Sequence, residues 1–149
     1  MTLSAAPLAA WLHVLVGQLL LPVLIALGLA LAAVIVEAGI ALGERVRGLA
    51  RLRAQADPAA VAKLARRRIE RADLLARAGP MLGLMGTLIP LGPGLAALGR
   101  GELASLAEAV ILAFDTTVLG LLVGLVGFVL GRLRRRWYDS LLDALEGAS

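Results

Sequence analysis

Three long apolar runs constrain this chain more than any other feature of its sequence. They extend from about Leu8 to Val36, from Ala78 to Gly99 and from Leu103 to Gly131. A helix of about 20 apolar residues crosses the roughly 30 Å hydrocarbon core of a bilayer, so each run is long enough to span a membrane. Only 17% of the 149 residues are charged, whereas about a quarter are charged in a typical soluble domain. The sequence therefore predicts an all-α integral membrane protein with three transmembrane helices.

The first run is predicted to be a retained transmembrane helix and not a secretory signal. A signal has a basic segment ahead of a short apolar core, whereas no Lys or Arg precedes Arg45. His13 and Glu37 lie near the two ends of this run and are interpreted as groups at the membrane interface.

The sequence lacks the residue patterns of an enzyme or a metalloprotein. It has no cysteine, and no Walker motif, metal-ligand cluster or nucleophile constellation can be identified. We therefore expect no cofactor, no metal site and no enzymatic activity. Aromatic residues make up 3% of the chain, which leaves few side chains for stacking on bases and argues against a nucleic-acid partner.

The distribution of basic residues predicts the orientation of the helices. Ten Lys or Arg and four acids lie between Glu44 and Arg77, and RLRRR follows the third run at residues 132–136. The loop between the second and third runs contains only Arg100 and Glu102 as charged residues. Because cytoplasmic loops are enriched in Lys and Arg, the topology is predicted to be N-out and C-in.

The chain is expected to divide into four segments along this topology. These are a first transmembrane helix at residues 1–43, a short basic cytoplasmic helical segment at 44–77, a hairpin of the second and third transmembrane helices at 78–137, and a cytoplasmic tail at 138–149.

The basic segment is expected to form a helix that lies near anionic lipid. Asp57 is a suitable N-cap and Pro58 a suitable first helical residue. A weak ion pair is expected between Arg67 and Glu70, which are helical neighbours. Binding of lipid headgroups is the favoured role for this basic surface, and a regulatory partner or a nucleic acid is the alternative.

Small residues recur along the second and third runs at helical spacing. In lipid, helices associate through small residues that let their backbones approach closely. We expect these glycines to form helix-packing surfaces and to hold the subunits of an oligomer together. The packing residues are Gly83, Gly86, Gly120, Gly124, Gly127 and Gly131.

Asp115 is the most informative single residue. A carboxylate inside a membrane helix costs several kcal/mol unless it is paired, hydrated or protonated, and such residues usually mark an ion path. The alternative is a hydrogen bond to a neighbouring helix, for example through Thr87 or Thr116. Thr117 is about 200° around the helix from Asp115, so either the helix is distorted or the two groups face different surroundings. Glu108 lies nearer the outer interface.

Two segments contain motifs in the order of a known family. GPMLGLMGTLIPLGPGLAAL, at residues 79–98, resembles the second helix of the MotA/TolQ/ExbB proton channel family, which has a GLLGTV-type segment. AFDTTVLGLLVGLVGFVLGRLRRRW, at 113–137, resembles the third helix of that family, where an ATAIGL or TTALGL segment follows a membrane carboxylate. Thr87 and Thr117 match the two pore threonines of the family.

The position of the carboxylate departs from the family pattern. In ExbB- and TolQ-like members the third-helix glutamate lies five residues before the threonine, which is Leu112 here. Asp115 lies three residues later on nearly the same face, and we expect it to take over part of the role of that glutamate. The ion pathway expected from the resemblance consists of Thr87, Glu108, Asp115, Thr116 and Thr117.

The resemblance implies a membrane motor subunit. It implies a homo-oligomer, a pentameric ring, that surrounds two helices of a single-span membrane protein resembling ExbD, TolR or MotB. Flow of H+ or Na+ through the ring would power mechanical work across the envelope, from a multi-pass protein in the inner, cytoplasmic membrane. A passive scaffold, an accessory subunit of a transporter, and a channel that needs no partner are the alternatives.

Overall fold

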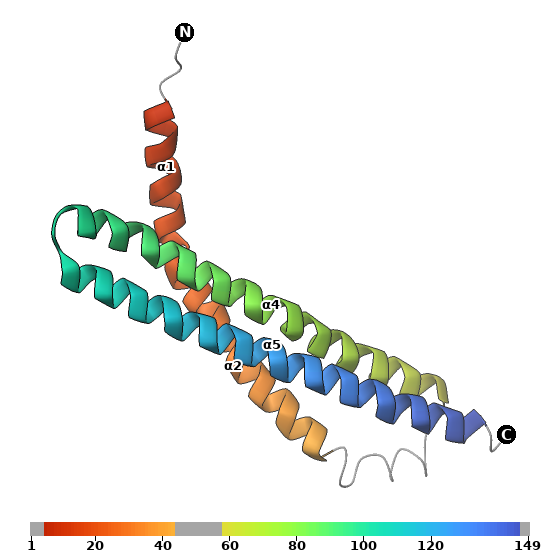
Figure 1. Ribbon diagram of the computed structural model, residues 1–149. Coiled ribbons are helices and arrows are strands. Elements are labelled where there is room, and N and C mark those ends of the chain that lie inside the picture. The colour runs from red at the N-terminus through yellow and green to blue at the C-terminus, as the bar shows by residue number, and fades with distance from the viewer. Residues whose placement is uncertain (1–4, 44–57, 147–149) are drawn as a thin grey trace. The chain divides into compact units, whose positions relative to one another are not determined.

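The computed structural model describes residues 5–43 and 58–146, and every regular element in these two stretches is an α-helix. The helices are α1 (Ala5–Gln18), α2 (Leu20–Gly43), α4 (Pro58–Gly99) and α5 (Leu103–Glu146) (Figure 1). By length and composition, three stretches of the described chain can cross a membrane: Trp11–Gly43, Ala62–Gly99 and Leu103–Ser140. The prediction of three long apolar helices is confirmed.

The first apolar run is interrupted near its start. α1 ends at Gln18, and the N–H of Leu19 donates to the carbonyl oxygen of Val16 at 3.1 Å, closing a tight turn. Pro22 accounts for the interruption, because it has no N–H to donate to the carbonyl of Gln18 and its ring crowds that carbonyl. The N–H of Val23 donates to the carbonyl of Leu19 at 3.0 Å as the helical pattern resumes in α2.

α4 and α5 are both longer than the apolar runs that they contain. α4 has 42 residues and begins at Pro58, as predicted, whereas the expected cap Asp57 lies outside the described residues. The helix continues without a break from its basic part into its apolar part and accommodates three internal prolines. α5 has 44 residues and extends past Gly131 to Glu146, since Arg and Leu are good helix formers.

A tight turn joins α4 to α5. The N–H of Gly101 donates to the carbonyl of Leu98 at 2.9 Å, and the N–H of Glu102 donates to the carbonyl of Ala97 at 3.0 Å. This pair of bonds is a Schellman motif, which requires a left-handed residue just after the helix. Gly101 takes that conformation with φ of 83°. The turn reverses the chain, so α4 and α5 lie side by side as antiparallel neighbours (Figure 1).

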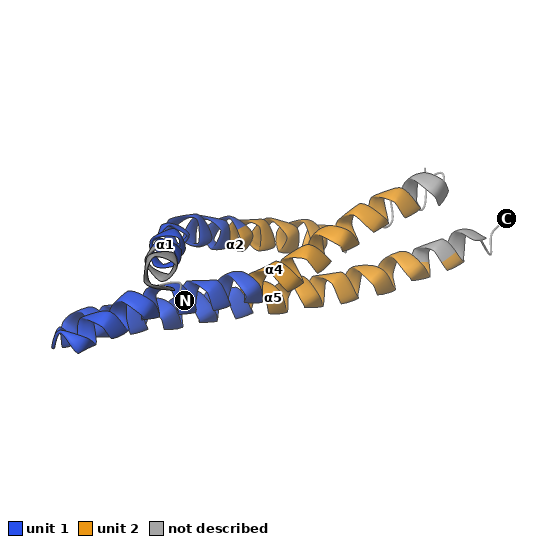
Figure 2. Cartoon of the chain, turned by 90° about the horizontal axis from the view of Figure 1, so that it is seen from above, with its two compact units in different colours: residues 1–29, 80–121 blue, residues 30–79, 122–149 orange. Residues whose placement is uncertain are grey.

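Contacts divide the chain into two compact units, which Figure 2 shows in blue and orange. Unit 1 consists of residues 1–29 and 80–121, and unit 2 of residues 30–79 and 122–149. In each unit a part of α4 packs against a part of α5.

Close approach of α4 and α5 depends on small residues in both units. A Cβ atom added to Gly83 would lie 3.2 Å from the Cα of Gly120 in unit 1. A Cβ atom added to Gly127 would lie 2.7 Å from the backbone nitrogen of Ala76 in unit 2. We call these contacts the small-residue interface. Its members are Gly83, Gly86, Gly94, Ala109, Thr116 and Gly120 in unit 1 and Ala72, Ala76, Gly127 and Gly131 in unit 2.

The buried positions of α5 follow a spacing of three and four residues, the repeat of a coiled coil. This repeat continues beyond the glycines into the basic end of the helix. Its buried members are Ala113, Thr116, Gly120, Gly124, Gly127, Gly131, Arg134 and Tyr138, and Val123 and Leu130 are buried beside it. The repeat explains why α5 keeps one face against its neighbours over many turns.

One ion pair of the basic stretch differs from the prediction. Glu70 accepts a hydrogen bond from Nε of Arg66 at 2.9 Å, and not from Arg67. The predicted pair was therefore wrong by one residue, because positions four apart are also neighbours on a helix and the long arginine side chain reaches across one turn. Both partners are exposed, so this pair contributes little to stability.

Candidate functional site

The hydroxyl groups of Thr87 and Thr117 donate to their own helices. Oγ1 of Thr87 donates to the carbonyl of Leu84 at 2.6 Å, and Oγ1 of Thr117 donates to the carbonyl of Ala113 at 2.9 Å. A hydroxyl whose proton is used in this way still has lone pairs that accept hydrogen bonds or coordinate a cation. Both side chains are half-buried, so each offers an acceptor oxygen and no free donor.

Thr116 lies inside the small-residue interface. It is only 2% exposed, and its hydroxyl donates to the carbonyls of Leu112 and Ala113, each at 3.0 Å. A Cβ atom added to Gly86 would lie 2.7 Å from the Cβ of Thr116 and 2.8 Å from its Oγ1. The side chain therefore fills the space that a glycine leaves on the facing helix.

Asp115 has a different environment from these threonines. It is exposed, and it forms no hydrogen bond or ion pair with any side chain in the described part of the chain. The hydroxyls of Thr87 and Thr116 donate to backbone carbonyls and not to Asp115. A hydrogen bond from either threonine, the alternative interpretation of Asp115, is thus not formed within one chain.

Asp115 and Thr117 face different sides of α5. The helix is unbroken through both residues, so it is not distorted to bring them together. A Cβ atom on Gly83 would lie 3.5 Å from the Cα of Thr117, which places Thr117 beside α4. Asp115 is exposed, and no described side chain bridges it to Thr117.

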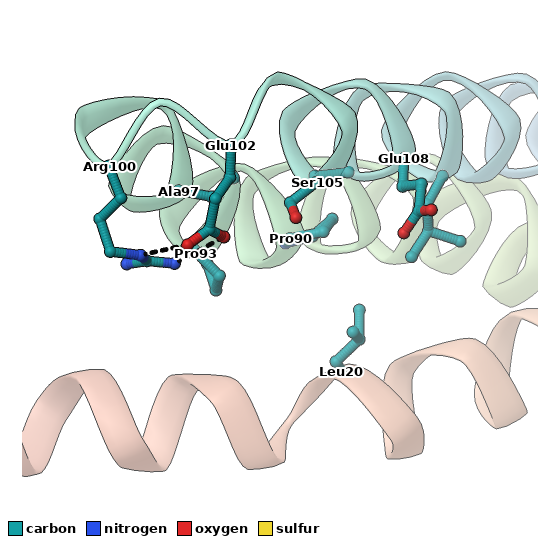
Figure 3. Close-up of a pocket in the computed structure, with 11 residues that line it drawn as sticks. Leu20, Pro90, Pro93, Ala97, Arg100, Glu102, Ser105 and Glu108 are labelled. Carbon is teal, nitrogen blue, oxygen red and sulfur yellow. Dashed lines mark hydrogen bonds and ion pairs between the residues drawn. The ribbon is translucent and has the colours of Figure 1, made fainter.

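Glu108 lies two helical turns before Asp115 and lines a pocket at the end of unit 1. Seven residues of helix correspond to about 10 Å along its axis. The pocket has a volume of about 400 Å³ and contains polar groups from Arg100, Glu102, Ser105 and Glu108. Figure 3 shows these side chains along one wall of the pocket, with Leu20 of α2 opposite. Asp115 is not among the residues that line it.

An ion pair in the turn between α4 and α5 forms one end of this pocket. Nε and Nη2 of Arg100 donate to the two carboxylate oxygens of Glu102, at 2.8 and 3.2 Å (Figure 3). The hydrogen bond from Arg100 holds the pKa of Glu102 below its usual value, and the same bond raises the pKa of Arg100. Both groups are therefore charged at neutral pH and neutralise each other, which leaves Glu108 as the carboxyl group without an ion pair among the described residues of the pocket.

The glycines selected from the sequence lie between helices of the same chain. A Cβ atom on Gly127 would approach backbone atoms of Ala72 and Ala76, and one on Gly131 would lie 3.0 Å from Oδ1 of Asp73. Gly124 is buried as well. Sequence analysis expected these glycines to hold subunits together. The short turn between α4 and α5 instead brings two glycine-rich helices of one chain into contact.

Sequence analysis missed a buried ion pair in unit 2. Arg134 is fully buried, and its Nη1 donates to Oε2 of Glu37 at 2.6 Å and to the carbonyl of Arg68 at 3.2 Å. Nη2 of Arg134 donates to the carbonyl of Glu37 at 3.3 Å. One guanidinium thus joins α2, α4 and α5. The burial of Arg134 could have been predicted from the sequence, because it continues the alternating spacing of three and four residues that separates the buried glycines.

Comparison with known proteins agrees with the resemblance noted in the sequence. Residues 31–147, well over half of the chain, match the MotA/TolQ/ExbB proton channel family. Comparisons with curated proteins and with solved structures gave no match. The matched range covers the last part of the first membrane span and the whole of α4 and α5. The chain therefore belongs to the MotA/TolQ/ExbB proton channel family.

Proposed function

We propose that this protein is the channel subunit of a membrane motor driven by H+ or Na+. Members of its family are proton-channel subunits and not enzymes. Five copies form a ring in the inner membrane, N-out and C-in, around the transmembrane helices of a single-span partner resembling ExbD, TolR or MotB. The observation on which this proposal depends is the exposed carboxylate of Asp115, which lies within a candidate span and has no partner among the described residues.

A bare carboxylate in a membrane helix requires compensation from outside the chain. It costs several kcal/mol unless water, a proton or a cation accompanies it. Because no described side chain compensates Asp115, a ring that encloses water and partner helices supplies the environment that this residue needs. In this arrangement Asp115 accepts the ion and releases it toward the partner.

Thr87 and Thr117 supply acceptor oxygens to the ion route. Their protons already bind helix carbonyls, so the lone pairs are free to accept a hydrogen bond from hydronium or to coordinate Na+. Glu108 is the outer carboxylate of the route, in the pocket at the end of unit 1. We assign Thr116 to helix packing, because its side chain is buried against Gly86.

An ion gradient is sufficient to power such a device. Each charge that crosses a potential of 100 mV releases about 2.3 kcal/mol. Several ions per step therefore supply enough free energy to move one set of helices inside another.

The test is partner-dependent ion flux in liposomes. Asp115→Asn keeps the shape of the side chain and removes its charge, so flux under an imposed pH or Na+ gradient should fall at least tenfold. Asp139→Asn is the matched control, since it makes the same change at an exposed position farther along α5. This control should retain full flux.

The outcome also separates the motor from the scaffold alternative. Full flux in Asp115→Asn would refute a role for this carboxylate in ion transfer. Absence of flux in the wild-type protein with its partner would instead favour the passive scaffold over the motor. Native mass spectrometry of the wild-type protein should show five copies, and a monomer or dimer in mild detergent would contradict the ring.

A further inference from the structure

A groove in unit 2 combines apolar walls with an exposed cation. It lies between α2 and α4, has a volume of about 420 Å³, and all of its residues belong to candidate membrane spans. Its charged members are Glu37 and Arg71. Its apolar members are Ala32, Ala33, Val36, Leu74 and Leu75.

The walls of the groove are open to the surroundings of the protein. Val36 is 60% exposed and Leu74 is 67% exposed. In a membrane protein the medium that contacts such walls is lipid. An acyl chain therefore fits the apolar part of the groove.

Arg71, the cation of the groove, has only a long contact with an acid among the described residues. The Glu37 carboxylate lies 2.6 Å from Nη1 of Arg134 and 4.0 Å from Nη1 of Arg71. The shorter and fully buried contact belongs to Arg134, whereas the Arg71 side chain is 71% exposed.

The acids beside Arg71 on α4 are also engaged. Glu70 pairs with Arg66 at 2.9 Å, and Asp73 pairs with Arg135 at 2.6 Å. Among the described residues, the exposed Arg71 guanidinium therefore has no ion pair other than its 4.0 Å contact with Glu37, so its donors at the open side of the groove can bind an anion from outside the chain.

We propose that this groove binds an anionic phospholipid, with its phosphate at Arg71 and one acyl chain against the apolar walls. A guanidinium and a phosphate form strong, charge-assisted hydrogen bonds. A headgroup without net charge carries its own cation, which competes with Arg71 for the phosphate. This inference does not depend on the ion route, because none of the groove residues belongs to that route.

The experiment is native mass spectrometry of the full chain in mild detergent, titrated with phosphatidylglycerol or phosphatidylcholine of the same acyl chains. Phosphatidylglycerol should be retained about tenfold more tightly, since one charge-assisted contact is gained. Arg71→Gln should abolish this preference. Arg77→Gln removes an equal charge from an exposed position of α4 that does not line the groove, and it should leave the preference unchanged.

A second variant tests the apolar part of the site. Ala33→Leu fills the groove and leaves Arg71 in place, so binding of both lipids should fall while the oligomer keeps its size. The proposal is overturned if the wild-type protein binds the two lipids equally, or if Arg71→Gln and Arg77→Gln have the same effect. It is also overturned if Ala33→Leu changes the oligomer, because a second copy of the chain would then occupy the groove.

Discussion

Replacing Gly127 with alanine should destabilise the packing of α4 against α5 in unit 2. The added Cβ would lie 2.7 Å from the backbone nitrogen of Ala76 and 3.0 Å from the carbonyl oxygen of Ala72. Backbone atoms of a helix cannot rotate away as a side chain can. The two helices must therefore separate locally, from 2.7 Å to an ordinary contact of about 3.4 Å, which is a shift of about 0.7 Å.

The cost follows from the contacts that this shift weakens. A gap of about 0.5–1 Å forfeits a quarter to a half of the dispersion energy of each contact. Overpacking of this kind typically costs about 1–3 kcal/mol. Gly28→Ala is the matched control, because nothing lies within 4 Å of its added Cβ and it makes the same change inside a helix. The difference in stability between the two variants isolates the packing cost from helix propensity.

The clash created by an alanine at Gly94, unlike the one at Gly127, should be relieved by a second substitution on the facing helix. Here the added Cβ meets a side-chain atom, the Cβ of Ala109, at 2.8 Å, and the next neighbour is the Cδ1 of Leu106 at 3.4 Å. The single variant Gly94→Ala should therefore destabilise the protein, and adding Ala109→Gly should recover most of the lost stability. No such exchange exists for Gly127, because its obstacles belong to the backbone.

The assay is reversible unfolding in mixed micelles with increasing SDS, followed by the fluorescence of Trp137. Trp11 is replaced by Phe in all variants so that a single tryptophan reports on α5. Gly127→Ala should unfold at a lower SDS fraction than Gly28→Ala. Equal midpoints would refute the close backbone contact, and a Gly94→Ala/Ala109→Gly protein as unstable as Gly94→Ala would refute the register of α4 against α5.

Three further outcomes are expected. Arg134→Met should cost about 3–5 kcal/mol because it leaves Glu37 without its buried partner, whereas the double variant Glu37→Met/Arg134→Met should recover most of this loss in thermal unfolding. In a carbon-13 NMR titration, Glu102 should titrate below the usual glutamate range, and Arg100→Gln should return its midpoint to that range. The contribution of Glu102 to stability is therefore present above its unfolded pKa and is lost as the pH falls through its lowered folded pKa. In liposomes, Thr87→Val should reduce flux several-fold and Thr87→Ser should retain it, since only the acceptor oxygen is needed.

The apolar runs predicted the existence of the membrane helices better than their ends. The change from basic to apolar residues at Arg77 and Ala78 predicts a boundary between cytoplasmic and membrane segments, which stays a prediction, and α4 is one continuous helix across it. A change in polarity alters the medium that a helix contacts but does not interrupt its backbone hydrogen bonds. The interruption before α2 was missed for the opposite reason, since Pro22 lies in a run of uniform polarity.

The residues of the candidate site were identified by type, but their surroundings could not be predicted. Asp115, Thr116 and Thr117 are consecutive, and sequence analysis placed all three on an ion route. In the structure the first is exposed, the second buried and the third half-buried. These differences depend on which face of α5 meets α4, and that is decided by the three-and-four spacing of small residues in both helices.

The basic end of α5 shows the same limitation more clearly. RLRRR was used in the sequence analysis only as a basic segment that predicts a cytoplasmic C-terminus. Arg134 alone among these arginines falls on the buried repeat, and it is buried beside Glu37, a residue nearly one hundred positions earlier in the sequence. A charge on a buried position needs a partner, but sequence spacing within one helix does not say which element supplies that partner.

The use of glycine within the chain limits how copies of the chain can associate. Gly83, Gly86 and Gly127 are each closed off by α4 or α5 of the same chain, so they are not available to a neighbouring subunit. In the proposed ring, contacts between subunits would then involve large apolar side chains that remain exposed, such as Leu84 and Phe114. Such side chains keep helix backbones farther apart than glycines do. If such side chains form the contacts between subunits of the proposed ring, those contacts should be looser than the contacts between α4 and α5 within each unit.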